Sequence, residues 1–177
     1  KAMNIYQIAL NQSSRLQQYN NISILRNKMG NLAYEQGDTK QAIILWESAL
    51  ELSKETGNLE ATGDAYHGIA IRTSDFDERI IYYNKALEIM EKLDAKSEIA
   101  YILTNMSGDY GIKKRFKKQF QLLNQALNIR KEINDHLGIA YSLSGLSDYY
   151  CMIGNYEKAK EYNNKSLTIK EKLGNKW

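Results

Sequence analysis

The sequence predicts an all-α protein built from repeated helical hairpins, and three observations support this. The 177 residues include no proline, so no helix meets a forced break. No sustained alternation of apolar and polar residues between turn signals marks a β-strand. One helical segment, GDTKQAIILWESALEL at 37–52, returns in the same frame at 74–89 and at 154–169. A repeated hairpin is therefore the simplest architecture.

The period of the repeat is set by a small residue in the second helix of each hairpin. The anchor residues are Ala9, Ala49, Ala86, Ala126 and Ser166, which are separated by 40, 37, 40 and 40 residues. A fixed period of this length is typical of solenoids, in which each unit packs only on its neighbours. We therefore expect an α-solenoid of antiparallel hairpins, with about four repeats and a leading half repeat.

The elements follow in order from this frame. Residues 1–19 match the second helix of a preceding repeat, and the complete repeats are expected at 20–57, 58–96, 97–136 and 137–177. In the first complete repeat, apolar residues recur at helical spacing in a first helix around Met29 and in a second around Trp46. Neither end shows a polar capping helix, so we expect a piece of a longer array whose uncapped ends could self-associate.

Short turns separate the helices. Gly37 and Gly154 suit the left-handed residue that ends a helix, and the Asp or Asn that follows each can cap the next helix. The second repeat is three residues short, either in the linker before its first helix or at the end of that helix. Arg79 and Gln119 replace the alanine found at Ala42, so packing around these two residues should differ.

These residues resemble the tetratricopeptide repeat family. Met29-Gly30 matches its Leu-Gly pair, and Ala42 with Trp46 matches its Ala-x3-Phe pattern. Leu146-Ser147 and Ala159 fill the same places in the last repeat, although the family's terminal proline is absent. The period of ~40 rather than ~34 residues is similar to the longer variety seen in kinesin light chain and in bacterial sensor and regulatory proteins. The resemblance implies a right-handed superhelix whose first helices line a concave, partner-binding surface.

Side chains on the first helices that point away from the second helices are the candidate binding residues. Asparagines one turn apart can hydrogen-bond to a peptide backbone, and tyrosines offer apolar area with a polar tip. The second repeat can be aligned with the others in two ways, and His67 lies on this face of its helix in only one of them. The alternative is that the asparagines are solvated and the tyrosines pack between repeats. The candidates are Asn27, Asn31, Tyr34, Asp64, His67, Ile71, Tyr101, Thr104, Asn105, Tyr141, Ser144 and Asp148.

The sequence offers no constellation for catalysis, so we expect a protein that is not an enzyme and needs no cofactor or metal. Its two histidines, His67 and His136, fall in different repeats, and no HExxH, GxSxG or GxxxxGK motif occurs. Cys151 is the only cysteine and is expected to be a small packed residue. The basic run KKRFKK at 113–118 falls on a turn, where solvated lysines are favoured over phosphate contacts.

The expected partner is a peptide or protein, bound by a scaffold or signalling part of a larger regulatory protein. The alternative is a helical-repeat protein that binds single-stranded RNA. A net charge of +3, from 24 basic and 21 acidic residues, argues against nucleic acid, as does an inner face of Asn, Ser, Thr, Asp and Tyr. No apolar run could span a bilayer and no signal peptide is recognised, so no membrane partner and a cytoplasmic location are expected.

Overall fold

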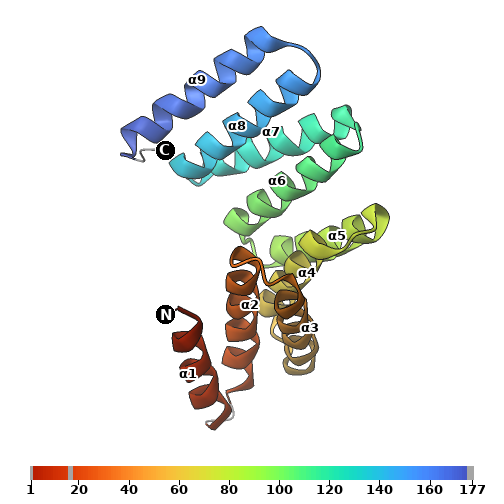
Figure 1. Cartoon of the computed structure of the whole chain (residues 1–177), viewed down its shortest axis with the longest axis vertical. Coiled ribbons are helices and arrows are strands. Elements are labelled where there is room, and N and C mark those ends of the chain that lie inside the picture. Colours follow the sequence, from red (N-terminus) through yellow and green to blue (C-terminus); the bar gives the residue numbers. More distant parts are fainter. Residues whose placement is uncertain (1, 16–17, 175–177) are drawn as a thin grey trace. The chain divides into compact units, whose positions relative to one another are not determined.

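The computed structural model describes residues 2–15 and 18–174, and within these residues the chain is helical with no strand (Figure 1). The chain divides after Asp94 into two compact units, which are described separately. Unit 1 contains α1–α5 and unit 2 contains α6–α9. The helices are α1 (Ala2–Arg15), α2 (Tyr19–Glu35), α3 (Thr39–Thr56), α4 (Leu59–Arg72), α5 (Phe76–Lys92), α6 (Lys96–Ile112), α7 (Phe116–Glu132), α8 (His136–Met152) and α9 (Tyr156–Lys172).

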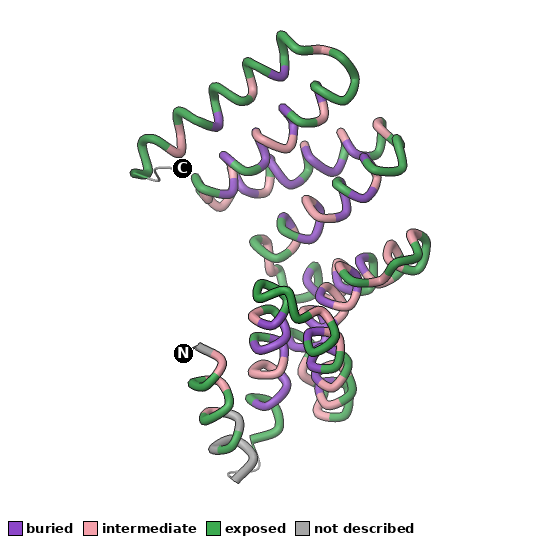
Figure 2. Tube along the Cα trace, in the orientation of Figure 1, coloured by how far each residue is buried: buried purple, intermediate pink, exposed green. Residues whose placement is uncertain are grey.

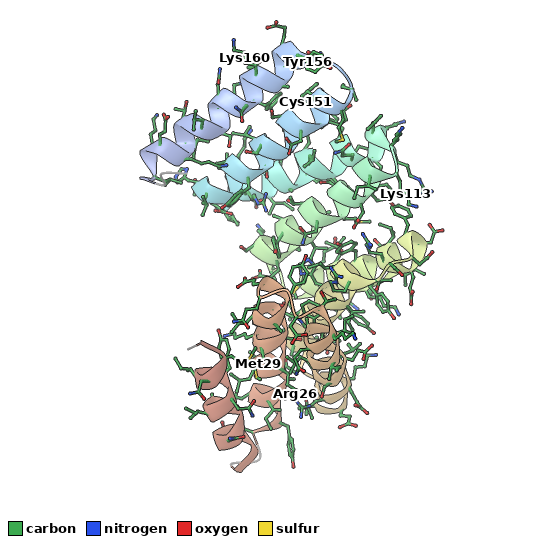
Figure 3. All side chains as sticks on the ribbon, in the orientation of Figure 1. Arg26, Met29, Lys113, Cys151, Tyr156 and Lys160 are labelled. Carbon is green, nitrogen blue, oxygen red and sulfur yellow. The ribbon has the colours of Figure 1, made fainter. Side chains whose placement is uncertain are left out.

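In unit 1, consecutive helices pack on one another, and α2 also contacts α4. The core lies around Trp46, which is 1% exposed and packs with Met29, Ala33 and Leu45. Met29 is labelled on α2 in Figure 3. Two glycines lie against the indole: a Cβ on Gly30 would come within 2.6 Å of the ring, and one on Gly68 within 2.5 Å.

Unit 2 has its own core. Its four helices pack in chain order, and Leu123, Leu127, Leu143 and Leu146 form a buried cluster between α7 and α8. Tyrosines extend this core, since the rings of Tyr150 and Tyr162 stack with centroids 5.3 Å apart. Figure 2 shows buried residues spread along α6, α7 and α8, whereas α9 is mostly exposed.

The turns between the helices have the glycine conformations and the helix caps expected from the sequence. Gly37 and Gly154 have φ values of 83° and 77°, in the left-handed region that glycine adopts without strain. The carboxylate of Asp38 accepts a hydrogen bond from the Gln41 amide at 3.1 Å and so caps α3. Asn155 caps α9 in the same way.

The second repeat is shortened at the end of its first helix. Each later first helix begins ten residues after its anchor, as Leu59 follows Ala49 and Lys96 follows Ala86. The linkers therefore match, but α4 has 14 residues where α2, α6 and α8 have 17. At the shortened end, the Arg79 Nε donates to the Thr73 carbonyl at 2.7 Å. The alignment that follows places His67 at the position of Asn27, Thr104 and Ser144.

Candidate functional site

Once the repeats are aligned, the candidate residues other than Tyr34 and Asn105 fall into two sets. We call Asn27, His67, Thr104 and Ser144 the middle row, because they occupy the ninth position of their helices. The open stripe lies one turn to either side of this row. Its members are Ile24, Asn31, Asp64, Ile71, Tyr101, Gly108, Tyr141 and Asp148.

The middle row is half-buried or buried, and two of its members, Asn27 and Ser144, hydrogen-bond to another helix. Asn27 is 2% exposed, and its Nδ2 donates to the Ala61 carbonyl of α4 at 2.7 Å. Ser144 on α8 shares a 2.8 Å hydrogen bond with the Ser166 hydroxyl of α9. The structure thus gives Asn27 a packing role between helices instead of the solvent-facing position expected from its spacing.

His67 is the titratable member of the middle row. It is half-buried, and its ring lies 6.0 Å from that of Tyr83, centroid to centroid. Burial lowers the pKa of His67 to about 4, because removing the imidazolium from water disfavours the charged form. His67 is therefore neutral at neutral pH.

In unit 1 the open stripe is tied to the tryptophan core. Asn31 is exposed, and its Oδ1 accepts a hydrogen bond from the Trp46 Nε1 at 2.9 Å. Tyr34 is 39% exposed; its ring centroid lies 6.0 Å from that of Trp46 and 5.7 Å from the Arg72 guanidinium carbon. The remaining candidates of this unit, Asp64 and Ile71, are half-buried.

In unit 2 the open stripe carries large exposed side chains. Tyr101 on α6 is 54% exposed and Tyr141 on α8 is 43% exposed. The Lys170 ammonium lies 5.2 Å from the Tyr141 ring centroid. Asp148 is exposed and Asn105 is half-buried.

A cavity of about 340 Å³ opens among α6, α7 and α8 beside Asp148. Its floor includes Gln119, which is 4% exposed and whose Oε1 is buried without a hydrogen-bond partner. In the sequence, Gln119 marks only an irregularity in packing, and Gly108, Gly111 and Gly145 carry no functional prediction. The available signal was the coincidence of this large residue with glycines on the preceding helix. The lining residues are Thr104, Ser107, Gly108, Gly111, Ile112, Gln119, Leu123, Gly145, Asp148 and Met152.

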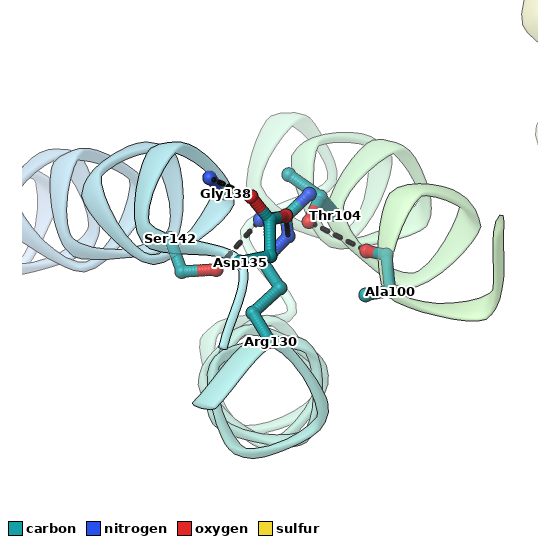
Figure 4. A network of polar contacts seen from close by, with 6 residues as sticks. All are labelled: Ala100, Thr104, Arg130, Asp135, Gly138 and Ser142. Atoms are coloured by element: carbon teal, nitrogen blue, oxygen red, sulfur yellow. Dashed lines mark hydrogen bonds and ion pairs between the residues drawn. The ribbon is translucent and has the colours of Figure 1, made fainter. Parts of the chain in front are cut away.

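A polar network next to this region is structural (Figure 4). The Arg130 Nη1 donates to the Ser142 hydroxyl at 2.6 Å, and its Nε lies 4.0 Å from the Asp135 carboxylate. Asp135 also accepts a hydrogen bond from the Gly138 amide and so caps α8. Burial lowers the pKa of the Arg130 guanidinium, and the charge of Asp135 partly opposes this shift. The network fastens α7 to α8.

Two further expectations meet different outcomes. Lys113 lies at the turn after α6, and the cationic residues of the 113–118 run are exposed, as expected (Figure 3). The expectation of a packed cysteine is wrong: Cys151 is exposed near the end of α8, where helical periodicity alone did not show that the outer side is uncovered.

Two features of the described residues concern metal binding and membranes. No group of three or more His, Cys, Asp or Glu residues is placed there to hold a metal ion. Among the helices described, none combines the length and apolar character needed to cross a membrane.

Within each unit, helical hairpins pack in chain order and the first helices carry exposed side chains, an arrangement typical of an α-solenoid. A tetratricopeptide repeat model matches residues 98–172, which confirms the predicted resemblance over this part of the chain. The family is typically a non-catalytic interaction module.

Solved structures confirm the predicted fold. BtubC (BKLC) from P. vanneervenii is 20% identical with a TM-score of 0.80, covering 100% of this chain and 75% of that one. The apo form of RapI is 23% identical with a TM-score of 0.74, covering 97% of this chain and 48% of that one, so this chain spans about half of RapI. No curated protein matches the sequence.

Proposed function

We propose that the chain is a protein-interaction module that binds an extended peptide or a partner helix on the open stripe of its first helices. In this proposal it serves as the sensing or scaffold part of a larger regulatory protein. The observation that supports it best is the exposure of Tyr101 and Tyr141 on equivalent positions of α6 and α8. Exposed tyrosines are favourable contact residues, because each buries a large ring while its hydroxyl stays hydrogen-bonded.

The middle row supports the same function indirectly. Its hydrogen bonds, such as that between Ser144 and Ser166, hold the helices in place before a partner arrives. A surface that is already ordered loses little conformational entropy on binding, so more of the contact energy appears as affinity. The proposed surface is therefore preformed.

In unit 1 only Asn31 is proposed to hydrogen-bond to a peptide backbone, a role that spacing in the sequence predicted for both Asn27 and Asn31. Trp46 fixes the Asn31 Oδ1, which orients the side-chain nitrogen as a donor to a peptide carbonyl. Asn27 contributes to the surface only by holding α2 against α4.

Site-resolved crosslinking tests the proposal. The photoreactive residue p-benzoylphenylalanine would replace Tyr101 or Tyr141, and control variants would carry it at the exposed positions Gln125 of α7 and Lys160 of α9, the latter labelled in Figure 3. We expect one protein to crosslink from both tyrosine positions at low and at high salt. Equal crosslinking from the control positions would contradict the proposal. Capture of RNA that disappears at high salt would instead support the RNA alternative.

A further inference from the structure

We propose that the cavity among α6, α7 and α8 is a recognition pocket that binds the basic side chain, lysine or arginine, of the partner peptide. This inference rests on the proposed function and adds the chemical class of the residue recognised. It depends on the hydrogen-bonding character of the lining residues, on the unpartnered Gln119 and on the charge at the mouth.

The polar groups of the pocket are mainly acceptors. The Thr104 hydroxyl donates to the Ala100 carbonyl at 2.8 Å, and the Ser107 hydroxyl donates to the Thr104 carbonyl at 2.6 Å. With their hydrogens used inside α6, these hydroxyls have only lone pairs to offer a ligand. The Asp148 carboxylate adds a negatively charged acceptor at the exposed edge.

Gln119 provides the observation that points to a ligand. Its side chain is buried, lines the pocket, and leaves Oε1 without a partner. A buried acceptor without a hydrogen bond costs about 1–3 kcal/mol, so such groups in folded proteins call for an explanation. A donor entering from the partner would satisfy this oxygen.

Glycines on α6 create the space. A Cβ on Gly111 would lie 2.6 Å from the Gln119 Nε2, so only glycine lets the amide lie against the helix. A Cβ on Gly108 would meet nothing within 4 Å, which is open space. The first repeat carries Asn31 at the position of Gly108 and Tyr34 at that of Gly111. Side chains of α2 therefore occupy places that on α6 are open or taken by the Gln119 amide.

A basic side chain matches this lining better than other types. Lysine and arginine heads carry only donors, whereas an amide or a carboxylate would set its own acceptors against those of the pocket. The methylene stem of either residue can pack on Ile112, Leu123 and Met152. None of the lining residues is basic, and the lysines at 114, 117 and 118 line a separate depression.

Nuclear magnetic resonance titration of the full chain tests the assignment. The probes are blocked Gly-X-Gly tripeptides in which X is arginine, lysine, glutamine or norleucine. We expect the arginine or the lysine peptide to shift the amide signals of Gly108, Gly111 and Gly145 in a saturable way. Asp148→Asn should weaken this binding about tenfold, because a charge-assisted hydrogen bond is lost. Asp77→Asn, the same change at an exposed residue of unit 1, should leave it unchanged.

Each outcome decides the assignment. Binding of only one basic peptide would support it and identify the residue recognised. Equal binding of the norleucine or glutamine peptide would overturn it, and so would an unchanged affinity in Asp148→Asn. If no tripeptide binds but Tyr101 and Tyr141 still crosslink a protein, the pocket assignment fails while the proposed function stands. If the basic tripeptides bind but no protein crosslinks, the proposed function fails and the pocket stands.

Discussion

At the residue scale, the indole of Trp46 packs so closely on α2 and α4 that only glycine fits at positions 30 and 68. We expect Gly30→Ala to lower the free energy of unfolding by about 1–3 kcal/mol, because the added methyl overpacks the Trp46 ring, which is buried and 1% exposed. The matched control, Gly108→Ala, adds the same methyl to open space and should stabilise its helix by up to about 1 kcal/mol. Urea denaturation followed by circular dichroism measures both. Equal effects of the two substitutions would contradict the packing argument.

Asn27 gives a second prediction at this scale. Asn27→Ala should lower the free energy of unfolding by at most about 1 kcal/mol, because the loss of the hydrogen bond to the Ala61 carbonyl is partly offset by removing the buried Asn27 Oδ1, which has no hydrogen-bond partner. Asn84→Ala, the same change at an exposed position of unit 1, should have little effect. Urea denaturation at fixed pH compares the two. A loss of partner binding in Asn27→Ala without any loss of stability would return this residue to the binding surface.

The pKa of His67 predicts a dependence of stability on pH. The folded protein holds this pKa at about 4, below the ordinary value of 6.5, so the unfolded chain binds the extra proton between these two values. Stability from this group is complete above pH 6.5 and falls as the pH drops towards 4, by as much as roughly 3 kcal/mol. His67→Gln should remove this component from the curve of unfolding free energy against pH. Parallel curves for the parent and the variant would contradict it.

The residues of the first helices show which parts of the candidate site helical spacing can predict and which it cannot. Spacing alone identified Asn27 and Asn31 as neighbours on one face. It did not show that α4 covers Asn27, because helical periodicity describes one helix and not the helix that packs against it. Tyr101 and Tyr141 were candidates from spacing and are exposed. The pocket at Gln119 was missed, because it depends on three helices together.

At the scale of the elements, the helix caps differ among the repeats. Asp38, Asn58, Asp75, Asp135 and Asn155 cap their helices with side-chain hydrogen bonds, whereas Ala95 before α6 cannot. The backbone of Ala95, with φ −81° and ψ 70°, nearly matches that of Asp38, with φ −81° and ψ 74°. The site is therefore shaped for a cap that its side chain does not supply.

We expect Ala95→Asn to raise the free energy of unfolding by about 1 kcal/mol, because its side chain can accept a hydrogen bond from an amide of the first turn. Ala95→Gly is the control, since it changes the backbone preference without a strong cap. Urea denaturation measures both variants. No gain in Ala95→Asn over Ala95→Gly would show that the first turn of α6 is already satisfied.

The helices themselves were largely predictable, and one boundary was not. Small residues at a fixed period and turn glycines such as Gly37 gave the hairpins and their order. The missing three residues of the second repeat could be assigned to the end of α4 only from the structure. The Arg79 side chain, which bonds the Thr73 carbonyl there, is distinguished in sequence only by not being alanine.

At the scale of the whole molecule, each of the two units has a core of its own among the residues that the structure describes. The cluster around Trp46 belongs to unit 1, and the leucine cluster around Leu146 belongs to unit 2. Repeat proteins are stabilised by contacts between neighbouring units, so a set of hairpins with its own core can fold alone. We expect a fragment of residues 95–177 to be helical and to unfold cooperatively in urea. A fragment without a cooperative transition would show that unit 2 depends on unit 1.

Gly108 and Asn31 occupy the same place in their repeats, and the difference between them separates folding from recognition. Asn31 presents a side chain to a partner, whereas Gly108 leaves open space, and the hairpins beneath keep the same frame. A solenoid of this kind can acquire a new preference by losing a side chain as readily as by gaining one. Single substitutions on the exposed surface can then change what the protein binds, while the residues that set the repeat and its fold stay the same.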